Sequence, residues 1–280
     1  MTLRSYLYVP GDRPDRLDSS LRRGADGIIV DLEDAVAPDR KETAREAVAD
    51  WVAHVRWTGE LWVRVNPGPL RETDVRALAT ARITGMCLAK TADRAEVEHI
   101  GAILDALGST AALAPVLETA ATVMDARAIA LAPRVQRLQI GEADLRAELG
   151  IETSDDEREL LYLRAHVVLS SAAAGVDPPL APASVNFRDL TAFEAGTRAL
   201  RRLGFYGRAC IHPAQVPVAN DVFTPTADEV EAARRILAST SDVGGAATAS
   251  DGMLIDEAVA RQARRTLLIA ERVTRGGRIA

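Results

Sequence analysis

The stretch Gly27-Ile-Ile-Val-Asp-Leu-Glu-Asp34, GIIVDLED, decides the fold, because a short apolar run ends directly in carboxylates. Parallel strands that are covered on both faces have such near-continuous apolar runs, and this one is too short for a buried helix. Similar runs recur along the chain. The expected strands are Ser5–Val9, Gly27–Asp31, Leu61–Asn66, Gly85–Lys90, Ala112–Glu118, Val135–Gly141, a poorly marked one near Ala183–Asn186, and Gly207–His212.

Amphipathic helices are expected between these strands. Thr191-Ala-Phe-Glu194 is a capping-box pattern, and the helix that follows is expected to run to Leu203, before Gly204. Asp93-Arg-Ala-Glu96 opens another helix, which Gly108 closes. Strand and helix alternate about eight times, which is typical of a parallel α/β fold.

The length of 280 residues favours closure of these units into a (β/α)8 TIM barrel with a short tail. A doubly wound open sheet is the competing architecture. The chain lacks the GxGxxG turn after its first strand and the GxxxxGK[ST] loop that mark common nucleotide-binding sheets. We therefore predict the barrel for residues 1–225.

Residues 226–280 are expected to form a helical extension. Thr226-Ala-Asp-Glu229 starts a helix that reaches about Ala238, and the small residues at 239–250 indicate a flexible linker. A last amphipathic helix follows, and it would serve equally well as a lid or as a packing or trimerisation helix. Its apolar side holds Ile255, Val259, Ala263, Leu267 and Ala270.

Composition excludes several classes of function. The net charge is −6 and aromatic residues make up 4%, with no basic stripe, so nucleic-acid binding is not expected. No apolar run is long enough to cross a bilayer, and the first residues contain no secretion signal. We expect a cytoplasmic protein without a membrane partner. Cys87 and Cys210 lie in apolar runs and are expected to be buried, inert thiols.

Polar side chains follow the predicted strands where an active site of this fold lies, at the carboxyl ends. Because the carboxylates outnumber the cations, and acids at close range resist ionising together, these residues favour a divalent ion. Oxygen ligands without clustered cysteine or histidine point to Mg²⁺, or to Mn²⁺. Glu118 and Asp144 are the best ligands. The other polar residues at these ends are Asp31, Glu33, Asp34, Arg64, Asn66, Lys90, Glu142 and His212.

His212 is a candidate general base, but a structural role in the loop formed with Pro213 is favoured, because proline fixes the turn. The chain contains neither a GxSxG elbow nor an HExxH helix, which excludes the serine-hydrolase and zinc-protease classes that carry those motifs.

Taken together, several stretches resemble the citrate lyase β-subunit / malyl-CoA lyase family of magnesium-dependent barrels, and they occur in the family's order over nearly the whole chain. They are LYVPGDRPDRL (7–17), DLEDAV (31–36), WVRVN (62–66), LAK (88–90), PVLETA (115–120), GEADLRAELG (141–150), CIHPAQV (210–216) and DGMLIDEAVARQARR (251–265).

The resemblance implies that Glu118 and Asp144 bind Mg²⁺, with Glu33 and Asp34 near the waters of the metal. Arg64 would face the developing enolate. It also implies a substrate and coenzyme A site to which Arg13, Lys90 and the loop at Pro213 belong. Asp256, within Met253-Leu-Ile-Asp256, would exchange the proton at the acyl-CoA α-carbon from a lid that closes over a neighbouring subunit.

The activity that the resemblance implies is cleavage of a 3-hydroxy-acyl-CoA of the citryl-, citramalyl- or malyl-CoA type into an acyl-CoA and a 2-oxo acid. A homotrimer or a dimer of trimers is also implied. The alternatives are a class II pyruvate aldolase without coenzyme A and a lyase subunit that needs an acyl-carrier protein partner. The chain departs from the family at the proline-rich stretch 178–186 and at 152–157, which leaves a thioesterase step open.

Overall fold

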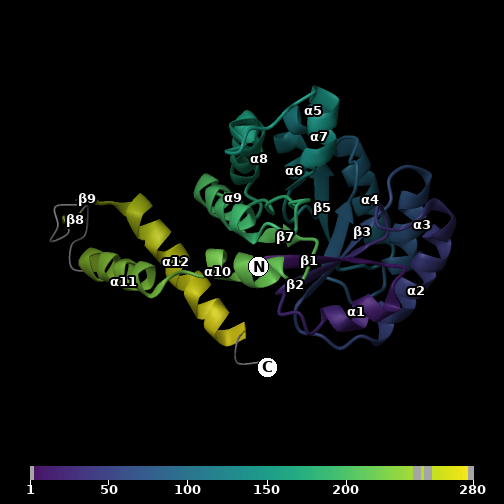
Figure 1. Ribbon diagram of the computed structural model, residues 1–280, viewed down its shortest axis with the longest axis horizontal. Coiled ribbons are helices and arrows are strands. Elements are labelled where there is room, and N and C mark those ends of the chain that lie inside the picture. The colour runs from purple at the N-terminus through teal and green to yellow at the C-terminus, as the bar shows by residue number, and fades with distance from the viewer. Residues whose placement is uncertain (1–2, 242–246, 249–253, 277–280) are drawn as a thin grey trace. The chain divides into compact units, whose positions relative to one another are not determined.

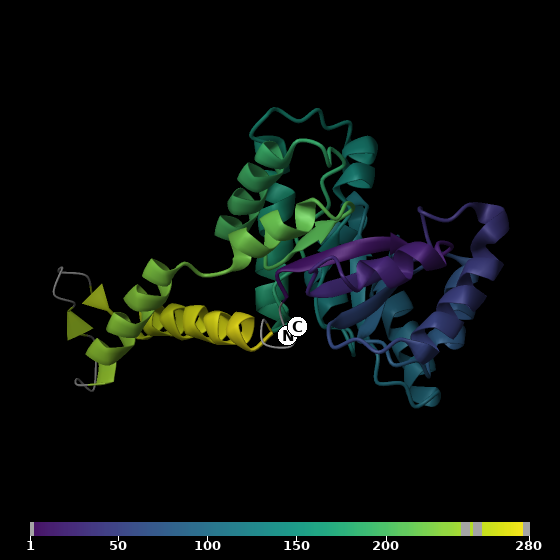
Figure 2. The same ribbon diagram turned by 60° about the horizontal axis from the view of Figure 1, so that its bottom comes forward.

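The computed structural model of the chain describes residues 3–241, 247–248 and 254–276 (Figures 1 and 2). The chain divides into two compact units, Met1–Asn220 and Asp221–Ala280.

The first unit contains a curled, all-parallel sheet of seven strands in the order β6-β5-β4-β3-β2-β1-β7 (Figure 1). Consecutive strands pair with one another, except that the last one, β7, pairs with the first. The strands are β1 (Ser5–Pro10), β2 (Gly27–Asp31), β3 (Glu60–Val65), β4 (Gly85–Leu88), β5 (Ala112–Leu117), β6 (Gln139–Ile140) and β7 (Arg208–Cys210). The parallel sheet agrees with the sequence.

The predicted strand at Ala183–Asn186 is wrong, because its residues lie outside any strand. Isolated parallel bridges form just before it and join Gln139 to Leu180 and Ala181 to Arg208. Prolines at 178, 179 and 182 surround this pair, and proline has no N–H for a sheet ladder. Two residues therefore stand between the edge strands β6 and β7, in the place of the eighth strand of a (β/α)8 barrel.

Helices cover the outside of the strands in the first unit (Figure 1). Left-handed glycines end three of them, Gly150 after α7, Gly175 after α8 and Gly204 after α9, and the last of these is as the sequence predicts. The helices are α1 (Pro14–Ser20), α2 (Lys41–His54), α3 (Pro69–Leu78), α4 (Arg94–Ala106), α5 (Ala120–Met124), α6 (Ala126–Ala130), α7 (Glu142–Leu149), α8 (Leu161–Ala174), α9 (Leu190–Leu203) and α10 (Gln215–Phe223), with short 3₁₀ turns at Pro38–Arg40 and Arg158–Leu160.

The start of α9 differs from the expected one. The capping residue is Asp189, whose side chain accepts the backbone N–H of Ala192 at 2.9 Å, and not Thr191. Aspartate and threonine both cap helices well, and Asp189 and Thr191 lie only two positions apart. The sequence pattern alone therefore favoured the wrong residue. The cap of α4 is as predicted, because Asp93 accepts the N–H of Glu96.

Alternate residues of the strands point into and away from the sheet interior, and this alternation places the polar site. The inner cluster consists of Tyr6, Ile29, Trp62, Cys87, Ala114, Val116, Leu180 and Ala209. Two residues further along their strands, Tyr8, Asp31, Arg64 and Glu118 therefore point inward as well. The larger outer cluster packs the strands against the helices.

A buried arginine closes the amino-terminal end of this interior. Arg137 is 1% exposed, and its Nη1 donates to the Tyr6 hydroxyl at 2.7 Å. Its guanidinium lies over the rings of Tyr6 and Trp62, 5.1 and 5.7 Å from their centroids. These three residues form what we call the interior plug.

The second unit contains α11 (Ala227–Ser241) and α12 (Glu257–Gly276), which pack against each other, and a short pair of strands, β8 (Ala247–Thr248) and β9 (Leu254–Ile255). The predicted helix start at Thr226 is confirmed, and it forms a capping box: Thr226 N–H donates to Glu229 Oε2, and Glu229 N–H donates to Thr226 Oγ1. Of the predicted linker, 239–241 is helical and Ala247–Thr248 is a strand, while 242–246 and 249–250 lie outside the described residues.

Both cysteines are buried and unpaired, as expected, and burial raises the pKa of each thiol to about 12. Among the residues described, no helix has the length and apolarity that a membrane span requires.

The cap assignment gives a direct test. Because Asp189 satisfies a backbone N–H at the start of α9, Asp189→Ala should lower the free energy of unfolding by about 1 kcal/mol. Thr191→Ala is the matched control, and this exposed residue should change the free energy by less than about 0.5 kcal/mol. Urea unfolding of both variants measures this, and a larger loss in Thr191→Ala would contradict the assignment.

Candidate active site

A cavity of about 700 Å³ opens at the carboxyl ends of the strands of the first unit. Five polar side chains that line it come from different elements: Tyr8 (β1), Asp31 (β2), Arg64 (β3), Glu118 (directly after β5) and Asp144 (α7). Because parallel strands end at the same edge of a sheet, residues far apart in the sequence meet here. Most of the polar residues that the sequence placed at strand ends line this cavity, whereas Glu33, Asn66 and Lys90 do not.

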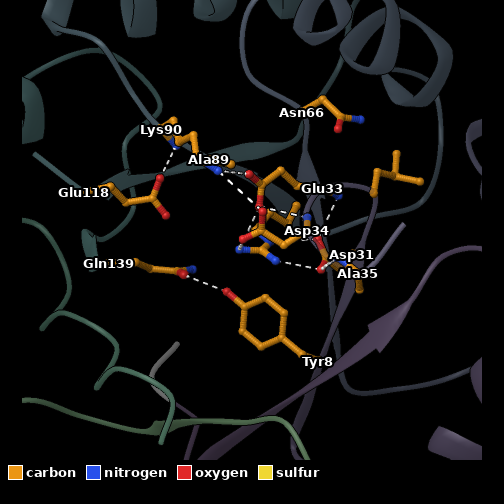
Figure 3. Close-up of polar contacts among 12 residues, drawn as sticks. Tyr8, Asp31, Glu33, Asp34, Ala35, Asn66, Ala89, Lys90, Glu118 and Gln139 are labelled. Atoms are coloured by element: carbon orange, nitrogen blue, oxygen red, sulfur yellow. Dashed lines mark hydrogen bonds and ion pairs between the residues drawn. The ribbon is translucent and has the colours of Figure 1, made fainter. Parts of the chain in front are cut away.

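An ion pair between neighbouring strands lies at the base of this site. Asp31, 2% exposed, accepts two hydrogen bonds from Arg64, from Nε at 2.7 Å and from Nη2 at 2.6 Å (Figure 3). The Asp31 carboxylate also accepts the backbone N–H groups of Glu33 at 2.9 Å and Ala35 at 3.1 Å. Asp31 therefore holds Arg64 and the loop after β2 at once, a role that the sequence did not assign to it.

Arg64 remains positively charged in this setting. Burial alone would lower its pKa, but the hydrogen bonds and charge of Asp31 outweigh burial and raise the pKa above its ordinary value. Its guanidinium lies 5.2 Å from the centroid of the Tyr8 ring, and its Nη1 reaches Glu33 at 3.1 Å. Arg64 thus presents a fixed cation to the cavity.

Glu33 and Lys90 stand beside the cavity and support the residues that line it. Glu33 is buried and contacts Arg64 and the Lys90 ammonium (Figure 3). The backbone N–H of Lys90 donates to Glu118 Oε2 at 2.6 Å. Asp34 is exposed and lines the cavity, 3.5 Å from the Lys90 ammonium. The contacts of Glu33 and Lys90 therefore link Arg64 to Glu118.

Glu118 is a buried carboxyl group with a high proton affinity. Burial raises its pKa to about 7, and the charges of Glu33 and Asp144 act in the same direction, against the hydrogen bond from Lys90. Gly141 allows this position, because a β-carbon there would lie 2.4 Å from Glu118 Cγ and 2.8 Å from Oε1. A carboxylate that resists ionisation next to other acids favours a bound cation.

Glu118 and Asp144 both line the cavity and could hold a metal ion. Asp144 lies exposed in the first turn of α7, near enough for its charge to raise the pKa of Glu118. Within the described ranges, no group of three or more His, Cys, Asp and Glu side chains forms a ready metal cage. Magnesium commonly takes only one or two carboxylates and completes its shell with water and substrate, so the pair fits that ion.

The expected coenzyme A residues are only partly placed at the cavity. Arg13 does not line it; its guanidinium instead pairs with Asp15, with both side chains exposed. Arg16 and Arg23 line the cavity, together with Ser19. Arg16 and Ser19 lie one helical turn apart on α1, which was the available signal, while Arg23 follows the end of that helix.

The loop after β7 also reaches the cavity. Pro213 lines it, as the sequence leads one to expect, and so does His212. The His212 ring stacks on Phe187, with centroids 4.8 Å apart, and its Nδ1 accepts the N–H of Ala214 at 3.2 Å. These contacts agree with the loop-shaping role that the sequence favoured for His212.

The cavity floor contains two residues that sequence reasoning missed. The Tyr8 hydroxyl donates to Gln139 Oε1 at 3.1 Å (Figure 3). Gln139 Nε2 contacts the sulfur of Cys87 at 3.1 Å. Burial raises the pKa of Tyr8, so its phenol keeps its proton. Side chains alternate between the two faces of a strand, and this alternation could have identified Tyr8 on β1 and Gln139 on β6 as residues that point into the cavity.

Asp256 belongs to the second unit. It is exposed and caps α12, because its Oδ1 accepts the N–H of Val259 at 2.9 Å. Leu254–Ile255, within the predicted lid motif, form β9, while Met253 lies outside the described residues.

Several known proteins are similar to this chain over most of its length. A citrate lyase subunit beta-like protein of Deinococcus radiodurans is 33% identical over 96% of this chain and 97% of that protein. An L-malyl-CoA/beta-methylmalyl-CoA lyase of Rhodobacter capsulatus is 32% identical over 93% of this chain and 92% of that protein. A (3S)-malyl-CoA thioesterase of Cereibacter sphaeroides is 31% identical, with 96% and 95% covered.

A solved structure supports the same relationship. The protein CitE of Mycobacterium tuberculosis, in complex with magnesium, acetoacetate and coenzyme A, has a TM-score of 0.80 and 28% identity, covering 96% of this chain and 98% of that one. The family model for HpcH/HpaI aldolase/citrate lyase matches residues 4–213, which include every strand of the parallel sheet. The chain therefore belongs to the HpcH/HpaI aldolase/citrate lyase family and is an enzyme of the carbon–carbon lyase type.

Proposed function

We propose that this protein is a magnesium-dependent lyase that cleaves a 3-hydroxy-acyl-CoA of the malyl-, citramalyl- or citryl-CoA type into an acyl-CoA and a 2-oxo acid. The observation that carries the proposal is the pair of opposite groups in one cavity, the buried Glu118 carboxyl and the Arg64 cation held by Asp31. The titles and names of the similar proteins, which mention magnesium, coenzyme A and malyl-CoA, support it.

Glu118 and Asp144 would hold the Mg²⁺ ion, which acts as a Lewis acid on a substrate oxygen when it is bound. Binding also relieves the electrostatic cost of Glu118, because a cation replaces the proton that its raised pKa otherwise retains. The backbone N–H of Lys90 donates to Glu118 Oε2 and so fixes the orientation of the carboxylate that would hold the ion.

The reaction moves one proton and breaks one carbon–carbon bond. The 3-hydroxyl group loses its proton as the bond between C2 and C3 breaks, C3 becomes the carbonyl carbon of the 2-oxo acid, and the bonding electrons pass to the acyl α-carbon. The negative charge is then shared with the thioester oxygen as an enolate, and the α-carbon of the enolate takes up one proton to give the acyl-CoA, which balances the proton released by the hydroxyl group. Arg64 stabilises this charge, because its guanidinium is fixed by Asp31 before the charge develops and has little to reorganise.

Asp256 is proposed to exchange the proton at the acyl α-carbon, from a lid supplied by a neighbouring subunit of a homotrimer or a dimer of trimers. Its carboxylate is exposed at the start of α12, where Oδ1 accepts the backbone N–H of Val259. Residues 226–280 would then form the lid domain and residues 1–225 the barrel domain. The cytoplasmic location stays a prediction.

Arg16 and Arg23 favour free coenzyme A as the carrier of the acyl group. Two guanidinium groups at the mouth of one cavity suit the phosphate groups of the coenzyme, and Ser19 adds a hydroxyl donor between them. These residues take the place that the sequence assigned to Arg13. An acyl-carrier protein partner remains the alternative, and the turnover experiment distinguishes the two.

Turnover with malyl-, citramalyl- and citryl-CoA tests the proposed function. We expect at least one of them to be cleaved with Mg²⁺, with acyl-CoA and 2-oxo acid appearing in equal amounts. Chelation of the metal, Glu118→Gln and Asp144→Asn should each lower kcat/KM by about a hundredfold or more. Condensation of pyruvate with aldehydes in place of cleavage would establish the aldolase alternative. Inactivity on all of these would favour the carrier-protein form.

The coenzyme A contacts are tested with three variants of neighbouring arginines. Arg16→Ala and Arg23→Ala should each raise KM for the acyl-CoA about tenfold, because a charge-assisted contact with a phosphate contributes about 1.5 kcal/mol or more, and kcat should change little. Arg22→Ala is the matched control, since Arg22 is exposed and does not line the cavity. Steady-state kinetics measure all three, and equal effects in all three would contradict a specific contact.

The proton-transfer role is tested by Asp256→Asn, which keeps a good helix cap while removing the base. We expect kcat to fall by about a hundredfold or more, with the melting temperature preserved. Glu257→Gln removes the same charge at the next position and should leave kcat within about twofold. Unchanged turnover in Asp256→Asn would remove this residue from the mechanism.

A further inference from the structure

Arg71 lies behind the cavity on α3, and its guanidinium contacts the ends of two neighbouring strands. It is 2% exposed. Its Nε donates to the carbonyl oxygen of Asn66, after β3, at 3.2 Å, and its Nη2 donates to the carbonyl oxygen of Ala89, after β4. Its Nη1 forms an ion pair with Glu96 of α4. Arg71 therefore holds three segments together without lining the cavity.

The contact with Ala89 reaches Glu118 through a single peptide unit. The carbonyl group that Arg71 contacts and the N–H group that donates to Glu118 Oε2 belong to the same planar Ala89–Lys90 peptide (Figure 3). A cation thus stands at the oxygen end of this peptide and a carboxyl group at its nitrogen end. Hydrogen bonds in such a chain polarise one another, so Arg71 strengthens the N–H as a donor.

The turn that contains this peptide needs support from its surroundings. Lys90 has a φ of 47°, in the left-handed region that non-glycine residues adopt only when other contacts hold them. Thr91 Oγ1 donates to the carbonyl oxygen of Leu88 at 2.9 Å, and Ala92 N–H donates to Glu96 at 2.7 Å. Glu96 is also the ion-pair partner of Arg71. The Arg71–Glu96 pair therefore holds the turn on both sides, because Arg71 contacts Ala89 and Glu96 accepts the N–H of Ala92.

We propose that Arg71 is a positioning residue for Glu118, which it orients for metal binding through the Ala89–Lys90 peptide. The inference rests on the proposed function, because it gives Glu118 the role of a metal ligand. A purely structural role is the competing explanation. The same helix offers a comparison for it: Asp74, one turn after Arg71, pairs with Arg45 at 2.6 Å and also accepts the N–H of Asn66, but among the described residues it forms no hydrogen bond with Ala89.

Direct titration with Mn²⁺, followed by the electron paramagnetic resonance of the free ion, separates these explanations. Arg71→Lys keeps the charge but cannot bridge three partners, and we expect Mn²⁺ affinity to fall about ten- to a hundredfold, as for other residues that orient a metal ligand. KM for the acyl-CoA should stay within about twofold while kcat falls. Arg45→Lys is the matched control; it should lower the melting temperature and leave Mn²⁺ affinity within about twofold.

A second variant covers failure of Arg71→Lys to fold. Arg71→Met/Glu96→Gln removes both charges of the buried pair together, which is tolerated better than leaving one charge alone, and it should show the same loss of Mn²⁺ affinity. Wild-type affinity in a folded Arg71 variant, or an equal loss in Arg45→Lys, would overturn the inference alone. If the wild-type protein bound no Mn²⁺, the proposed metal site would fail and the inference with it.

Discussion

The buried ion pair of Asp31 and Arg64 is the interaction on which the rest of the site depends. Each charge is removed from water, so each needs its partner, and loss of one would leave the other uncompensated at a cost of about 3–5 kcal/mol. From this pair, contacts continue through Glu33 and Lys90 to Glu118. They join the ends of four neighbouring strands, β2 to β5. The geometry of the cavity is thus set by buried charges, each of which needs an oppositely charged partner.

Much of the fold follows from local pattern. Strands such as Gly27–Asp31 are apolar throughout and end in charged residues, so both their position and their polar end could be predicted. The strand expected before β7 could not be placed from sequence. The neighbouring prolines leave only Leu180 and Ala181 to bridge the edges of the sheet, and two residues are too few to show a periodic pattern. The start of α9 was misplaced for a different reason: Asp189 and Thr191 are both good caps, and only the three-dimensional path of the backbone chooses between them.

Site residues could be predicted where the end of a strand determines their position. They could not be predicted where their role depends on which group they form an ion pair or hydrogen bond with. Glu118 and Arg64 follow from the alternation of inward positions and lie in the cavity. Arg13 was expected there because of its neighbouring motif, but its pairing with Asp15 and the rotation of α1 bring Arg16 to the cavity instead. The role of Arg71 could not be found from sequence, since it depends on a carbonyl group that carries no side-chain signal.

The interior plug of Arg137, Tyr6 and Trp62 separates two kinds of constraint within one interior. The contacts between its arginine and its aromatic rings stabilise the amino-terminal ends of the strands. The reacting groups lie at the carboxyl ends of the strands and in the loops that follow them. Substitutions in those loops leave the plug intact, and substitutions in the plug do not touch the reacting groups. Natural selection can therefore change what the mouth accepts while the base of the scaffold continues to fold, so that new substrates do not require a new architecture.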